Sequence, residues 1–218
     1  MITKRNILQH FVAACAVLVL PLAHAQPAKS AAAQTPDALV LDLSKDVLAS
    51  VKTDKSLQSG DISQLQKLVD EKILPYVNFE KMTRLAVGRG WRQATPEQRE
   101  QLTKEFRTLL VRTYAGALAS AREHEVKLQP FRPQSEKDVV VRTQVVAPRG
   151  EPIQLDYRLE KTDVGWKIYD VNVLGVWLVE NYRNSFAGEI NQHGVDGLIK
   201  SLVERNRQPA STEKKAAS

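Results

Sequence analysis

Few side chains in this sequence could carry out a reaction, and those present lack the spacing that catalysis or metal binding needs. Beyond residue 25 the only histidines are His124 and His193, which lie far apart and lack metal-ligand spacing. No G-x-S-x-G elbow or P-loop occurs, and Gly88-Arg89-Gly90 is not followed by the third glycine of a dinucleotide fingerprint. We therefore predict exposed histidines at helix ends, and no catalytic residue, metal or cofactor.

Asp156 and Asp170 are the carboxylates best placed to act together, because they lie on neighbouring predicted strands. Paired carboxylates can perform general acid–base chemistry. Both residues, however, fall on the polar positions of their strands. This alternation favours solvent-facing charges that pair with Arg158 or Lys167 over a reactive pair.

The N-terminus has the three parts of a cleavable export signal. Lys4 and Arg5 precede an apolar segment, residues 11–22, and Ala23-His24-Ala25 forms an A-x-A cleavage site. Cleavage after Ala25 would also remove Cys15, the only cysteine of the sequence. The signal peptide, residues 1–25, therefore predicts an exported protein without thiol chemistry or disulfides.

The composition is that of one globular domain. The 218 residues are 43% hydrophobic and 26% charged, which excludes wholesale disorder. Removing the two basic residues of the signal from the 31 in the chain leaves 29 against 25 acidic ones, a net charge of +4. Export and the mixing of both signs argue against a nucleic-acid partner. Residues 26–35 are predicted to form a flexible linker and residues 208–218 a disordered polar tail, which leaves 36–207 as the domain.

Helical periodicity and capping residues dominate the first half of the domain. Apolar residues recur at every fourth position over residues 36–51, as on an amphipathic helix. Asp61 and Asn78 can each cap a further helix. Thr95-Pro96-Glu97-Gln98 is a capping box, which predicts a longer helix reaching about His124.

The pattern then changes from helical to alternating. Alternation predicts four antiparallel strands, near residues 126–131, 139–146, 153–160 and 168–173. On the last strand, Tyr169, Val171 and Val173 fall on the apolar face. Two helices follow, over residues 176–190 and 195–203. These elements predict an α+β fold in which N-terminal helices, a four-stranded curved antiparallel sheet and C-terminal helices enclose an apolar cavity.

Several segments in a fixed order give this chain a specific resemblance. They are Leu74 to Val77, Ala94 to Arg99, Tyr114 to Leu118, Gly175 to Arg183, and Gly194 to Leu198. Together they span roughly residues 36–207 and resemble the MlaC family, also called the toluene-tolerance family. One departure stands out, because this chain has Leu174-Gly175-Val176-Trp177 where family members often carry Glu-Gly-Val-Ser. The bulky Trp177 changes the local shape of the pocket or of a docking surface.

The resemblance implies a periplasmic phospholipid carrier that encloses acyl chains and performs no covalent chemistry. Such a carrier shuttles lipid between outer-membrane and inner-membrane complexes and so maintains the lipid asymmetry of the outer membrane. The implied partners are phospholipid, an inner-membrane ABC transporter bearing a ring of MCE domains, and an outer-membrane lipoprotein–porin complex. A monomer suffices for this task, because one chain can enclose the cavity.

The expected lipid-binding residues come from the apolar strand face and from two groups of helices. Arg183, near the expected cavity mouth, is the candidate for contact with the headgroup. The candidate lining residues are Leu85, Leu110, Tyr114, Leu118, Val141, Val145, Leu155, Tyr157, Val171, Val173, Val179, Tyr182 and Phe186.

Three other interpretations remain open at this stage. The same residues could form an ordinary solid core beneath the sheet. A hydrolase or isomerase on a cone-shaped α+β fold would need an acid–base residue facing the cavity, yet the inward strand positions are almost wholly apolar. A periplasmic chaperone or lipoprotein carrier would bind a polypeptide anchor rather than a diacyl phospholipid.

Overall fold

The computed structural model describes residues 34–208. The predicted signal peptide, residues 26–33 of the predicted linker and residues 209–218 of the predicted tail lie outside the described part. The helical elements are α1 (Pro36–Thr53), α2 (Lys55–Gln58), α3 (Ile62–Leu68), η2 (Val69–Ile73), η3 (Leu74–Tyr76), α4 (Phe79–Val87), α5 (Gly90–Gln93), α6 (Pro96–Ser120), η4 (Ala121–Glu123) and α7 (Leu178–Arg207). The strands are β1 (Glu125–Leu128), β2 (Asp138–Val146), β3 (Ile153–Thr162), β4 (Gly165–Val173) and β5 (Val176–Trp177).

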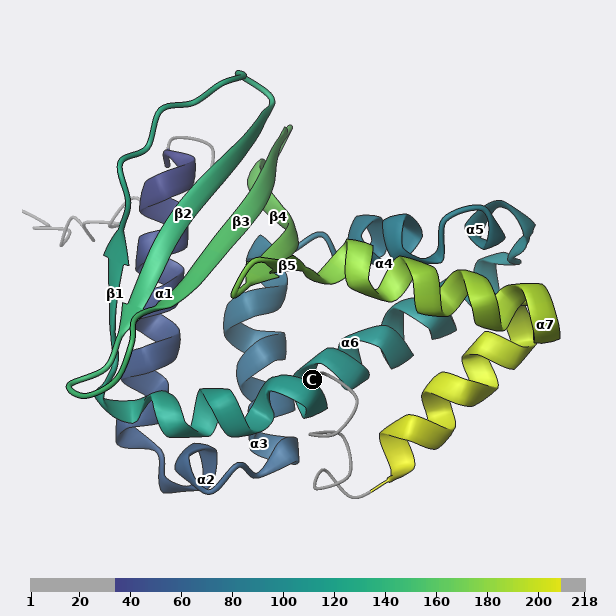
Figure 1. Ribbon diagram of the computed structural model, residues 1–218, viewed down its shortest axis with the longest axis horizontal. Helices are drawn as coiled ribbons and strands as arrows, with labels where there is room; N and C mark the ends of the chain where they lie inside the picture. The colour runs from purple at the N-terminus through teal and green to yellow at the C-terminus, as the bar shows by residue number, and fades with distance from the viewer. Residues whose placement is uncertain (1–33, 209–218) are drawn as a thin grey trace, which may run out of the picture.

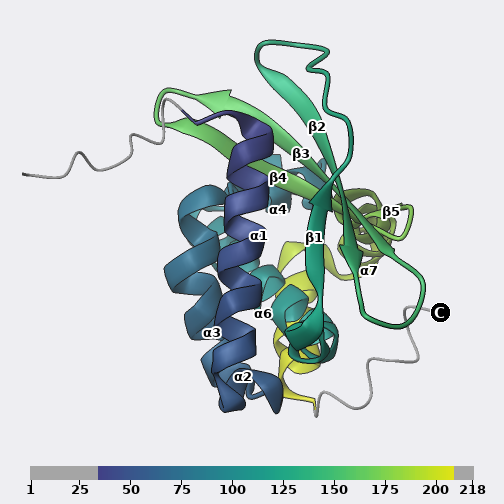
Figure 2. The same ribbon diagram turned by 90° about the vertical axis from the view of Figure 1, so that its left-hand side faces the viewer.

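The strands form one antiparallel sheet in the order β1-β2-β3-β4-β5. In Figure 2 this sheet arches over one side of the helices, with α1 lying along it next to β1. Figure 1 shows α6 running from the β1 end of the sheet towards α7, against which it packs. The α+β class and its order of helices, sheet and helices are therefore confirmed.

The predicted helix starts follow from side chains that supply hydrogen-bond acceptors to free backbone N–H groups. The Asp61 carboxylate accepts from the backbone of Ser63 and Gln64 at 2.9 and 3.2 Å. Asn78 accepts from Lys81 at 2.9 Å, and Thr95 and Gln98 form both bonds of the capping box. These caps set where α3, α4 and α6 begin.

The sheet has five strands rather than the four predicted, because residues 176 and 177 pair with β4 instead of starting a helix. Leu174 and Gly175 form the two-residue turn between the strands, and both have positive φ angles, 52° and 91°, as in a type I′ hairpin. Leu174 is the only non-glycine residue with positive φ among those described, and it is 67% exposed. Sequence patterning missed the hairpin because leucine is an unusual residue for such a turn.

A β-bulge reverses one predicted side-chain orientation on β4. Arg158 pairs with Asp170 whereas Leu159 pairs with Ile168, so Tyr169 is the extra residue. Ile168 therefore packs with Val141 and Leu159 at 2% exposure. Tyr169 is also buried, at 9% exposure, but its hydroxyl turns to Asp138, so the prediction that it shares the apolar face with Val171 is wrong.

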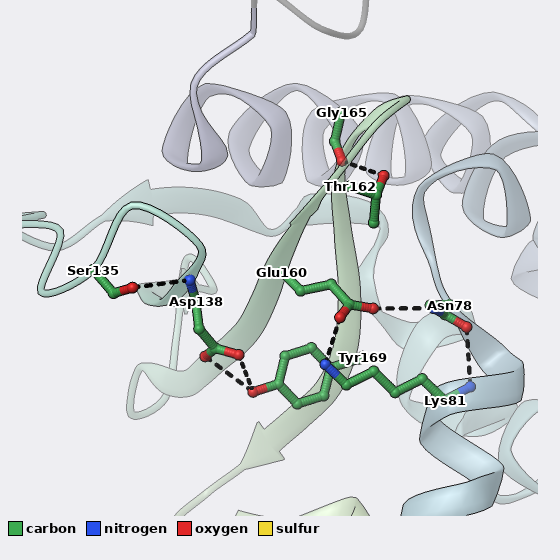
Figure 3. Close-up of polar contacts among 8 residues, drawn as sticks. All are labelled: Asn78, Lys81, Ser135, Asp138, Glu160, Thr162, Gly165 and Tyr169. Carbon is green, nitrogen blue, oxygen red and sulfur yellow. Dashed lines mark hydrogen bonds and ion pairs between the residues drawn. The ribbon is translucent and has the colours of Figure 1, made fainter.

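Figure 3 shows Tyr169 on the outer face of the sheet, among polar side chains. Its hydroxyl donates to the Asp138 carboxylate at 2.9 Å, and the Lys81 ammonium lies 3.7 Å from its ring centroid. Lys81 also pairs with Glu160 at 2.6 Å, and Asn78 donates to the same carboxylate at 3.0 Å. This network fastens the start of α4 to β3 and β4.

The last helix is bent where the sequence predicts a break. Gly194 has φ 72° and ψ −175°, values outside the helical region, so α7 consists of two helical segments. The first segment carries Val179, Tyr182 and Phe186, and the second packs with Leu198 and Leu202 into the same core.

Candidate functional site

The sheet side of the candidate site, the sheet wall, is one continuous apolar face, which is the inner face of the sheet. The register places Val141 opposite Tyr157, Tyr157 opposite Val171, and Leu155 opposite Val173. Directly opposed residues project to the same side of a sheet. Val141 and Val145 are buried, at 0% and 9% exposure, whereas Leu155, Tyr157, Val171 and Val173 are only half-buried.

The helix side of the site, the helix wall, comes from α4, α6 and the first segment of α7. Leu110, Val179 and Phe186 are buried there, and Leu85, Tyr114 and Tyr182 pack half-buried against them. Leu118 lies elsewhere, because it packs with Val111 against the core between α1, α3 and α6. The structure thus brings together all the predicted helix residues except Leu118.

Phe106 is a core residue of this helix wall that the sequence-based list of site residues omits. It is fully buried, and its ring meets those of Tyr182 and Phe186 edge-on, with centroids 5.0 and 5.2 Å apart. A signal was present, since Phe106 lies four residues before Leu110 and eight before Tyr114 on the apolar side of the same helix.

The two walls meet at Val171. This residue packs against the helix cluster, which contains Leu110 and Phe186. It also packs against the sheet cluster, which contains Val141 and Leu159. Tyr157 opposite it on β3, Val173 on its own strand and Tyr182 of the helix wall are likewise half-buried. The junction can therefore bury further apolar surface if an apolar ligand enters between the walls.

Two surface clefts of about 570 and 400 Å³ lie away from this junction. The larger is lined by Phe79, Trp91 and polar residues of α6, including Arg99 and Lys104. The smaller lies between α1 and the chain around His124. Neither cleft is lined by a predicted lipid-binding residue, so the enclosed cavity between sheet and helices stays a prediction.

The electrostatics of the walls come from tyrosine hydroxyls rather than from charges. Burial, and to a lesser extent electrostatic repulsion from Tyr182, raises the pKa of Tyr114 to about 12. Burial also raises the pKa of Tyr157, against the opposing effect of hydrogen bonds with Ser44 and Thr143. These phenols are neutral at neutral pH, so they offer hydrogen bonds without an ionic group.

The raised pKa of Tyr114 predicts a loss of stability in alkali. Above pH 10 the unfolded chain ionises this phenol while the folded chain does not, so the free energy of unfolding falls as the pH rises from about 10 to about 12. We expect Tyr114→Phe to lose less stability over this window than the unsubstituted protein does. Urea unfolding followed by circular dichroism at several pH values measures the difference, and equal losses in both proteins would contradict the assignment.

Asp156 and Asp170 are buried, at 6% and 1% exposure, so the prediction of solvent-facing carboxylates is wrong. Asp170 is buried because the start of α7 covers it, and its carboxylate accepts a hydrogen bond from the backbone N–H of Val179 at 3.0 Å. The predicted pairing of Asp170 with Arg158 is present at 3.1 Å, and Asp156 lies 4.0 Å from Arg142. Burial raises the pKa of Asp170, opposed by these bonds from Val179 and Arg158.

The histidines do not assemble a site with other ligating groups. His193 is largely exposed, and its Nδ1 lies 3.0 Å from Glu189 one turn earlier on α7. His124 follows η4 and is half-buried. Within residues 34–208, no group of three or more His, Cys, Asp or Glu side chains could hold a metal ion. No helix in this range combines the length and apolarity needed to cross a membrane.

The fold and the site define an α+β protein in which a curved antiparallel sheet and a layer of helices face each other through apolar and tyrosine side chains. The family model described as MlaC protein matches residues 41–204. The chain belongs to the MlaC family.

Two relatives match most of the chain. The intermembrane phospholipid transport system binding protein MlaC of Haemophilus influenzae is 26% identical over 186 residues, and the match covers 83% of this chain and 87% of that protein. The toluene tolerance protein ttg2D of Pseudomonas putida is 25% identical over 179 residues, which are 82% of this chain and 83% of that protein.

A solved structure shares the fold. The phospholipid-binding protein from Ralstonia solanacearum, solved in complex with a phospholipid, is 47% identical with a TM-score of 0.76. The likeness covers 79% of this chain and 97% of the Ralstonia chain.

Proposed function

We propose that this protein is a periplasmic phospholipid carrier that encloses acyl chains between the inner face of the sheet and the helices α4, α6 and α7. One observation carries the proposal: both walls carry half-buried apolar side chains and meet at Val171, in the fold of a 47% identical relative that was solved with a phospholipid. The name of the Haemophilus relative, an intermembrane phospholipid transport system binding protein, supports the same task.

The energetics of lipid transfer explain why such a carrier is needed. At about 0.8 kcal/mol per methylene, two acyl chains of about 16 carbons cost roughly 25 kcal/mol to expose to water. A carrier must cover both chains during transit, and spontaneous release from it is correspondingly slow.

Loading and unloading then require a partner at each membrane that offers the tails another apolar path. We propose an inner-membrane ABC transporter with a ring of MCE domains and an outer-membrane lipoprotein–porin complex as those partners, with the protein acting as a monomer. Lipid transfer by this chain needs no catalytic residue, and its predicted wall residues include no carboxylate or histidine.

Native mass spectrometry of the exported protein tests the proposal directly. We expect protein purified from the periplasm to begin after residue 25 and to carry a mass increment that extracts as diacyl phospholipid. Lipid identification gives the number of chains. An empty protein that also takes up no phospholipid from vesicles would contradict the proposal and favour a solid core. A bound polypeptide anchor would favour the lipoprotein carrier instead.

We propose that Arg183 contacts the headgroup. It is exposed on the first segment of α7, and its Nε donates to the Leu85 carbonyl of α4 at 3.0 Å, which holds the guanidinium beside the helix wall. We expect Arg183→Glu to slow phospholipid uptake from anionic vesicles, since opposite charge near the phosphate is replaced by repulsion. Unchanged lipid content and transfer would contradict the role of Arg183, and Glu180→Gln, exposed on the same helix, serves as the control.

A further inference from the structure

The helix α7 starts without a cap of its own. Trp177 occupies the N-cap position and makes no side-chain cap bond, although the first N–H groups of any helix need acceptors. Asp170 on β4 supplies one, because its Oδ1 accepts from the N–H of Val179, the second residue of α7, at 3.0 Å. The acceptor therefore comes from the sheet and not from the helix.

The same carboxylate is fastened to two strands. Its Oδ1 also accepts from the backbone of Val171 at 2.9 Å, and its Oδ2 lies 3.1 Å from the Arg158 guanidinium on β3. Arg158 stacks in turn on the Trp177 ring, with 3.9 Å between the guanidinium carbon and the ring centroid. Figure 1 shows β5 beside β4 and leading into α7. Because Asp170 is only 1% exposed, water cannot replace a lost contact, and losing one would leave buried charge without a partner at a high energetic cost.

The backbone partners of Asp170 are themselves wall residues. Val171 belongs to the sheet wall, where the two clusters meet, and Val179 belongs to the helix wall. Tyr182 and Phe186 follow Val179 at helical spacing on α7, so the orientation of its first turn sets where they lie. One carboxylate is thus bonded to the backbone of both walls.

We propose that Asp170 is a positioning residue that holds the helix wall at a fixed separation from the sheet wall, with Arg158 and Trp177 securing it from the outer face. The inference rests on the proposed function for its effect on lipid. An acceptor that only capped α7 could come from any part of the protein and would stabilise the helix equally well. A tether must also restrain the position of α7 relative to β4. The two roles therefore predict different results when a local cap replaces Asp170.

The double variant Asp170→Ala with Trp177→Ser separates the two roles, because serine at the N-cap position can accept from the helix itself. Spin labels on Lys161→Cys and Asn184→Cys, both exposed positions, report the distance between β3 and α7 in protein lacking residues 1–25, which has no other cysteine. We expect folded protein with a broader or displaced distance distribution and about tenfold faster loss of phospholipid to acceptor vesicles. An unchanged distance distribution would overturn the inference.

Arg158→Gln provides a second test if the double variant does not fold, since it removes the ion pair and the ring contact that secure the Asp170 carboxylate and leaves the carboxylate that accepts from Val179. Arg142→Gln is its matched control, because Arg142 contacts Asp156 on the same face of the sheet at 4.0 Å. We expect the distance to change in Arg158→Gln and not in Arg142→Gln. Equal distances in both would count against Arg158 securing the carboxylate that tethers α7. The distance readout needs no lipid, so unsubstituted protein that binds no phospholipid contradicts the proposed function separately.

Discussion

Replacing Val173 with aspartate is expected to yield a folded protein that carries no phospholipid. Val173 is half-buried on the inner face of β4, opposite Leu155 and against the helix cluster. A carboxylate at this position must either stay hydrated, which keeps water between the walls, or lose its water at high cost. A penalty of about 4 kcal/mol or more lowers lipid affinity by about a thousandfold or more. Native mass spectrometry and lipid extraction measure the occupancy.

Val164→Asp is the matched control for this experiment. It introduces the same charge on the turn between β3 and β4, where Val164 is 65% exposed. We expect this protein to retain its lipid, because its carboxylate remains in water. Full lipid occupancy in Val173→Asp, or equal losses in both variants, would show that this part of the sheet does not face the acyl chains.

Phe106→Ala is expected to lower the free energy of unfolding by about 3–5 kcal/mol, because it leaves a cavity at a fully buried position of the helix wall. The ring is fully buried and makes edge-on contacts with Tyr182 and Phe186 at interplanar angles of 73° and 76°. Such aromatic pairs add about 0.5–1.5 kcal/mol each beyond the area they bury. Urea unfolding gives the loss from the shift in midpoint at constant slope.

Phe131→Ala serves as the comparison, since Phe131 is only partly buried at the edge of the sheet cluster. We expect its loss to be clearly smaller. A loss below about 1 kcal/mol for Phe106→Ala would mean that the surrounding helices collapse onto the vacated space. In that case the helix wall is not the rigid surface inferred from its ring contacts.

The elements that could be predicted from sequence are those whose determinants are local. Asp61, Asn78 and the capping box at Thr95 bind backbone groups two or three residues away, so short motifs identify them. Gly194 likewise breaks α7 through its own backbone angles. Alternation also placed the apolar residues of β2 and β3 correctly, because those strands pair without a shift in register.

The features that could not be predicted depend on contacts between distant segments. The bulge at Tyr169 exists only through the pairing of β4 with β3. It places Tyr169, which alternation assigns to the apolar face, on the outer face of the sheet. Asp170 looks solvent-facing from alternation, yet the start of α7 covers it. Among the candidate site residues on the helices, Leu118 packs with a different cluster from the others, because helix α6 presents apolar side chains to more than one neighbour.

The turn before α7 also bears on how the protein would respond to selection in the laboratory. Leu174 adopts a left-handed backbone at φ 52° and leaves two thirds of its side chain in water. A leucine there incurs roughly 1 kcal/mol of strain and gains little burial in return, whereas glycine or asparagine adopts the same angles readily. Screening a mutant library for heat resistance alone would therefore replace Leu174 early. Retention of leucine under a screen for transport would mark the hairpin tip as a place where activity and robustness conflict.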